Sequence, residues 1–121
     1  MLSKAFKDHL LNPRNMGDMA GHHGMGEVTG PECGDMMSVY IRVREGRIID
    51  IRFKTFGCWA AIGAGSMLTE MARGMTLEEA RQLSRNDLAA ELKGIPPDKE
   101  HCVELGIRAL QQAIDDYQFH S

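Results

Sequence analysis

Long hydrophobic runs are missing from this sequence. No window approaches the ~18 consecutive apolar residues of a membrane span, and the first residues lack the apolar core of a secretory signal. A surplus of positive charge is missing too, because 14 Lys and Arg residues stand against 17 Asp and Glu residues, for a formal net charge of −3. We therefore expect a cytoplasmic protein that binds neither membrane nor nucleic acid.

Cysteine is scarce, and its pattern argues against a disulfide framework. The chain has three cysteines, an odd number, and no Cys-x-x-C pair. In a chain without a secretory signal, this count disfavours structural disulfides. Three uses remain open: buried free thiols, a reactive thiol, or ligands of a metal site.

Internal repeats and composition changes of the kind that mark a domain boundary are also absent. A chain of 121 residues is long enough for one core and too short for two ordinary lobes. We expect a single domain over residues 1–121. Residues 1–23 should be partly mobile, because the segment 16–23 is rich in Gly and Met.

The sequence does contain a strand meander followed by helices. Segment 24–30 is expected to be an edge strand, and apolar residues alternate with polar ones over 37–43 and again over 49–53. The turn Glu45-Gly46 between these runs predicts an antiparallel hairpin, with Ile49, Ile51 and Phe53 on the core face of its second strand. This order predicts an α+β fold with a small antiparallel three-stranded sheet and helices packed on one face.

Capping residues predict where most helices begin. Ser3 opens a helix over 2–11, and a mostly apolar helix is expected over 59–73. Thr76 and Ser84 open two short helices, and Asp98 is expected to cap the last one. The apolar stripe of that last helix contains Cys102, so we expect it to lie on the sheet.

The joint between the second hairpin strand and the following helix is the first place to look for chemistry. The alternating run ends at Gly57-Cys58, and small apolar residues follow. Cys58 thus precedes a helix N-terminus, where backbone N–H groups and the positive end of the helix dipole favour a thiolate.

The other two cysteines also lie at or near the ends of elements, Cys33 in a Pro/Gly loop and Cys102 in the first turn of the last helix. Asp35 follows Cys33 by two residues, which puts both side chains on one face of an extended segment. His101 precedes Cys102. Asp35 can equally stabilise a turn, His101 can be a surface residue, and free cysteines are often buried. The spacing alone therefore leaves a shared metal site open.

Four short motifs run through the chain in order. They are Asn12-Pro13-Arg14-Asn15, Cys33-Gly34-Asp35, Phe53-Lys54-Thr55-Phe56-Gly57-Cys58 and Pro96-Pro97-x-Lys99-x-His101-Cys102. Together they resemble the signature set of the IscU/NifU-type iron–sulfur cluster assembly scaffolds, the NifU N-terminal-like domain. The resemblance covers almost the whole chain, and it implies a scaffold or carrier protein rather than an enzyme.

The resemblance implies that Cys33, Asp35, Cys58 and Cys102 hold a nascent iron–sulfur cluster, with [2Fe–2S] favoured over [4Fe–4S]. Soft thiolates suit such clusters and zinc, whereas a carboxylate is a harder and more weakly held ligand. A site of this composition holds a cluster and also lets it go, as a scaffold must. A four-iron product is easier to house between two chains, so a homodimer stays open.

The resemblance also implies partners. A cysteine desulfurase would supply sulfur, and iron–sulfur apo-proteins would accept the cluster. Family usage favours Cys102 as the persulfide acceptor, whereas position at a helix N-terminus makes an equal case for Cys58. His101 would assist as a proton donor, or replace Asp35 as a ligand in a zinc-bound form. Asp98 stands where scaffolds served by an Hsp70-type chaperone have Val, and this charge disfavours that partnership.

Other interpretations remain beside this one. Trp59 follows Cys58 where relatives often have small or hydroxyl residues. It would shield a cluster, belong to a partner surface, or simply pack against the rim of the sheet. The alternative function with the same ligands is a zinc-binding sulfur acceptor or regulator of a cysteine desulfurase. A third interpretation is a structural module with three inert core cysteines.

Overall fold

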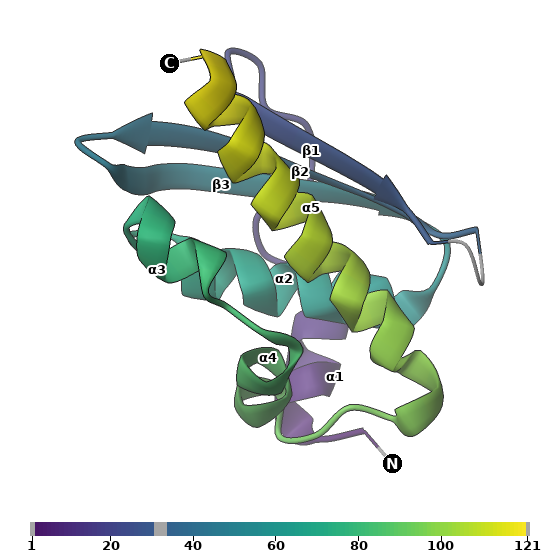
Figure 1. Ribbon diagram of the computed structural model, residues 1–121. Helices are drawn as coiled ribbons and strands as arrows, with labels where there is room; N and C mark the ends of the chain where they lie inside the picture. The colour runs from purple at the N-terminus through teal and green to yellow at the C-terminus, as the bar shows by residue number, and fades with distance from the viewer. Residues whose placement is uncertain (1, 31–33, 121) are drawn as a thin grey trace.

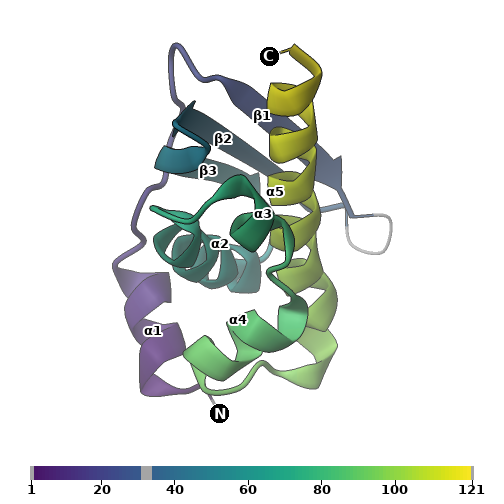
Figure 2. The same ribbon diagram turned by 60° about the vertical axis from the view of Figure 1, so that its left-hand side comes forward.

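Three strands form one antiparallel sheet in the order β1-β2-β3 in the computed structural model, which describes residues 2–30 and 34–120 (Figure 1). The strands are β1 (Gly24–Thr29), β2 (Met36–Arg44) and β3 (Arg47–Phe56). Helices cover one face of this sheet (Figure 2). The α+β class and the three-stranded antiparallel sheet predicted from the sequence are confirmed.

The hairpin between β2 and β3 contains a bulge that the alternating pattern did not reveal. Arg42 pairs with Asp50 and Val43 pairs with Ile48, so Ile49 has no partner across the ladder. As a result Ile48 is fully buried, whereas the side chain of Ile49 is 44% exposed. The prediction that Ile49 lies on the core face is wrong, because one extra residue in a strand reverses the alternation beyond it.

The long C-terminal helix α5 (Glu100–His120) crosses β1 and β2 on the helix-covered face (Figure 1). Glycine in β1 permits this close approach. A Cβ atom on Gly24 would lie 2.4 Å from the carbonyl oxygen of Ala113, and one on Gly26 would lie 2.1 Å from that of Ala109. Any larger side chain at these positions would push α5 away from the sheet.

Helix α2 (Trp59–Ala72) lies between the sheet and helix α1 (Lys4–Leu11), as its nearly all-round apolar surface predicted (Figure 2). Two glycines let aromatic rings contact its backbone from both sides. A Cβ on Gly63 would lie 2.5 Å from the ring of Phe6, and a Cβ on Gly65 would lie 2.5 Å from the ring of Phe53. The core is thus continuous from the sheet through α2 to α1.

The short helices begin where the capping residues predicted. Helices α3 (Leu77–Arg81) and α4 (Arg85–Leu92) each open with a capping box, made by Thr76 and by Ser84. The start of α5 differs from the prediction. Asp98 lies inside a 3₁₀ turn, η1 (Pro97–Lys99), and α5 begins at Glu100. Pro97 has a fixed φ and no N–H, so it starts a tight turn one residue before Asp98.

The segment between α1 and β1 runs along the outer edge of β3. The Gly17 N–H donates to the Phe53 carbonyl at 2.8 Å, and the Phe53 N–H donates to the Asn15 carbonyl at 2.8 Å. The mobility expected for residues 1–23 stays a prediction. Among the residues described here, no helix is long and apolar enough to cross a membrane.

Candidate functional site

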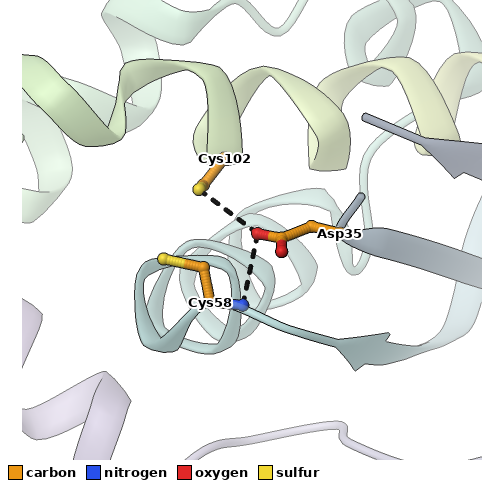
Figure 3. Close-up of side chains that lie close together, drawn as sticks. All are labelled: Asp35, Cys58 and Cys102. Atoms are coloured by element: carbon orange, nitrogen blue, oxygen red, sulfur yellow. Dashed lines mark hydrogen bonds between the residues drawn. The ribbon is translucent and has the colours of Figure 1, made fainter. Parts of the chain in front are cut away.

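The ends of three elements meet at one edge of the sheet. Asp35 immediately precedes β2, and Cys58 follows β3 after the single residue Gly57. Because β2 and β3 are antiparallel, with Met36 opposite Phe56, the start of one strand and the end of the other lie side by side. The first turn of α5 then brings Cys102 over both (Figure 3).

The ligand atoms of these three side chains form a tight group. One carboxylate oxygen of Asp35 and the Sγ atoms of Cys58 and Cys102 all lie within 4.8 Å of one another. The Cys102 thiol donates to Asp35 Oδ2 at 3.5 Å, and the Cys58 backbone N–H donates to the same oxygen at 3.2 Å (Figure 3). Two thiols and a carboxylate at this spacing can bind one metal ion or one face of a small cluster.

Cys58 is the N-cap of α2. Its backbone is extended, and its Sγ accepts the Ala60 N–H at 3.4 Å. The thiol therefore faces the positive end of a helix, as the sequence predicted, and that position favours the thiolate. Cys58 is half-buried, so reagents in solution reach it.

Cys102 lies in a different environment. Its side chain is fully buried, and burial raises the pKa of the Cys102 thiol, with Cys58 and Asp35 beside it adding to the rise. Without a metal, the Cys102 thiol therefore stays protonated and donates a hydrogen bond to Asp35. Asp35 is only 5% exposed, so these hydrogen bonds satisfy a carboxylate that water barely reaches.

Gly57 has a role that the sequence did not reveal. Its φ is +120°, and a Cβ atom there would lie 2.1 Å from Asp35 Oδ1. Only glycine therefore lets the β3–α2 joint pass close enough for the Cys58 N–H to reach Asp35. The sequence shows a glycine directly before the cysteine that caps the helix. This pattern indicates a sharp joint between β3 and α2, but it does not indicate that the Asp35 carboxylate approaches the joint.

The sequence predicted two further site residues, Cys33 and His101. Cys33 lies outside the described residues. His101 is half-buried, and within residues 2–30 and 34–120 the group of potential ligand atoms includes Asp35, Cys58 and Cys102 but not His101. The ligand role of all five residues stays a prediction.

Trp59 directly follows Cys58 and is 39% exposed. Its ring centroid lies 5.9 Å from that of Phe6 in α1. The ammonium of Lys99 lies over the indole, 5.6 Å from the ring centroid. Trp59 therefore contacts an N-terminal helix and a cation from the turn before α5, a pairing that the sequence did not predict.

These features define a class of protein: a small α+β domain that gathers thiols and a carboxylate where two strands and a helix end. The chain belongs to the family described as NifU-like N terminal domain, whose family model matches residues 2–121.

Individual relatives agree with this membership. The iron–sulfur cluster assembly scaffold protein IscU 1 of Archaeoglobus fulgidus is 50% identical over 117 residues, which cover 97% of this chain and 76% of the relative. The IscU scaffold protein of Escherichia coli K12 is 44% identical over 115 residues, covering 92% of this chain and 89% of the relative. Among solved structures, the N-terminal part of a NifU-like protein from Brucella abortus has a TM-score of 0.80 at 17% identity, covering 98% of this chain and 95% of that one. At that identity the likeness supports the fold alone.

Proposed function

We propose that this chain is a scaffold on which an iron–sulfur cluster is assembled and from which the cluster passes to apo-proteins. The observation that carries the proposal is the convergence of Asp35, Cys58 and Cys102, whose ligand atoms lie within 4.8 Å of one another. Relatives named as iron–sulfur cluster assembly scaffolds, up to 50% identical to this chain, support it.

The ligand chemistry suits a cargo that is held and then released. The thiolates of Cys58 and Cys102 are soft donors that bind sulfide-bridged iron well, whereas the Asp35 carboxylate is harder and exchanges more readily. Family resemblance supplies Cys33 as the fourth ligand. The relatives named as scaffold proteins support the role of a carrier rather than that of an enzyme.

Sulfur delivery requires a thiol that a partner can reach. Cys58 is half-buried and Cys102 fully buried, so we assign the first sulfur to Cys58. Its thiolate attacks the outer sulfur of a persulfide on a cysteine desulfurase; the new S–S bond forms as the partner's S–S bond breaks, and the partner's cysteine leaves as a thiolate. Mass spectrometry after incubation with desulfurase and cysteine should show the added sulfur in Cys102→Ser and none in Cys58→Ser; the reverse pattern assigns the role to Cys102.

Anaerobic reconstitution with iron and sulfide, followed by iron, sulfide and zinc analysis, tests the proposal. We expect a coloured protein with acid-labile sulfide and iron in equal amounts, and loss of the colour in Cys58→Ser. Bound zinc with no sulfide would instead support the zinc-binding sulfur acceptor or desulfurase regulator. Thiols that neither react in the metal-free protein nor gain protection from metal would support inert core cysteines.

The finer points remain predictions of the same proposal. They are a [2Fe–2S] product, zinc in the cluster-free form, a zinc-ligand or proton-donor role for His101, a homodimer, a cytoplasmic location and a weak Hsp70-type partnership because of Asp98. Sedimentation of the metal-free and loaded protein tests the dimer.

A further inference from the structure

Lys99 and Trp59 connect the two elements that present the thiols. Trp59 is the residue after Cys58 and the first residue of α2, and Lys99 lies three residues before Cys102, at the end of the η1 turn. The Lys99 ammonium lies 5.6 Å from the centroid of the Trp59 ring, directly over it. The geometry is that of a cation–π contact, for which Trp is the strongest partner. No other contact of this kind in the described chain joins α2 to the turn before α5.

Trp59 also contacts helix α1. Its ring centroid lies 5.9 Å from that of Phe6, which is fully buried and reaches the backbone of α2 because Gly63 has no side chain. The indole therefore contacts both a buried ring of α1 and the cation of Lys99, while 39% of the Trp59 surface remains exposed. Because the lysine side chain is long and flexible, its contact with the ring can break and form again.

We propose that the Lys99–Trp59 contact is a clasp that keeps the first turn of α5 against the N-terminus of α2, so that the Cys58 and Cys102 thiols stay together and the held cluster leaves slowly. When Lys99 leaves the ring, the turn carrying Cys102 moves away and the site opens. The clasp rests on the proposed scaffold function for its cargo, but its opening can be measured without any cargo.

The strength of such a contact sets the size of the effect. A cation–π contact at a partly exposed site changes an opening equilibrium by about two- to five-fold. Removing it should therefore raise the rate at which Cys102 is alkylated in the metal-free protein by that factor. The loss of a nearby positive charge alone acts in the opposite direction, because a cation favours the reactive thiolate. Faster labelling thus reports opening and not electrostatics.

The test compares four proteins by peptide mass spectrometry of alkylated Cys102. Lys99→Met should label about two to five times faster than the wild type, and Lys99→Arg should label at the wild-type rate because it keeps the cation. Lys7→Met is the matched control, since it removes the same charge from an exposed position on α1. Equal rates in Lys99→Met and Lys7→Met would overturn the clasp.

A double-mutant cycle tests the contact itself. In a Trp59→Leu background, Lys99→Met should have no further effect on Cys102 labelling; independent, multiplying effects would overturn the proposal. The labelling rate should depend weakly on low urea concentrations, as local opening does, whereas a steep dependence would mean global unfolding and would also overturn it.

A further experiment measures cluster release from protein that has been loaded with a cluster. Lys99→Met should lose its cluster to an iron chelator faster than the wild type by the same factor as its labelling, and an unchanged rate would overturn the link between clasp and cargo. Failure of the wild type to take up a cluster would reject the scaffold function and leave the labelling result standing. The single Trp of the chain gives a fluorescence signal from the clasp alone.

Discussion

Replacing Gly57 by Ala should disable the site without removing any ligand. Two costs follow from the structure. The φ of +120° is strained for a residue with a side chain, by about 1–3 kcal/mol. A Cβ would also lie 2.1 Å from Asp35 Oδ1, which forces Asp35 or the joint to move and adds about 1–3 kcal/mol of overpacking. We expect the free energy of unfolding of the metal-free protein to fall by about 2–6 kcal/mol in total.

Gly94 supplies a matched control for this substitution. Its φ is +112° and nothing lies within 4 Å of a Cβ built there, so Gly94→Ala carries the strain without the clash. Urea unfolding should show the larger loss for Gly57→Ala, and iron and sulfide uptake should fall in Gly57→Ala alone. Equal stability and equal uptake in the two variants would refute the claim that glycine is required at position 57 because Asp35 lies against it.

Three further predictions concern titration and release. Asp35→Ala should lengthen the lifetime of a held cluster because it removes the hard ligand, while costing the metal-free protein about 1–3 kcal/mol by leaving the Cys58 N–H without its acceptor; equal or faster transfer to an apo-ferredoxin would contradict this. Because burial raises the pKa of Cys102, its alkylation in the metal-free protein should be slower than that of Cys58 near neutral pH and should accelerate as pH rises; equal rates near neutral pH would count against it. Burial lowers the pKa of His9, whose Nδ1 lies 2.7 Å from Ser66 Oγ. As the pH falls, His9 therefore takes up a proton at a higher pH in the unfolded chain than in the folded protein. The free energy of unfolding should consequently decrease below about pH 6.5. His9→Gln should flatten that drop in urea midpoints measured above and below this pH, and an unchanged slope would reject the assignment.

Local signals in the sequence sufficed for much of the fold. Capping boxes at Thr76 and Ser84 depend on side chains three residues apart, so the sequence shows both partners at once. The stripe of α5 that contains Cys102 likewise follows from helical spacing alone. These elements were predicted because the interactions that form them are short-range.

Features that depend on distant partners were not predicted. The residue types around Ile49 do not reveal the bulge. Only the pairing of β3 with β2 shows that Ile49, and not Ile48, faces outward. Gly57 meets Asp35 and Lys99 meets Trp59 across many residues of sequence, so neither contact has a local pattern. For the candidate site, the sequence named the residues and the topology of β2, β3 and α5 then placed Asp35 beside two thiols.

Transfer of the cluster to an acceptor protein is the decisive test of the scaffold function. Anaerobically loaded protein is mixed with an apo-ferredoxin in the presence of an iron chelator that intercepts free iron. We expect the ferredoxin spectrum to grow as the scaffold loses an equal amount of iron and sulfide, with little iron reaching the chelator. A cluster that stays on the chain, or that reaches the ferredoxin only when the chelator is left out, would contradict it.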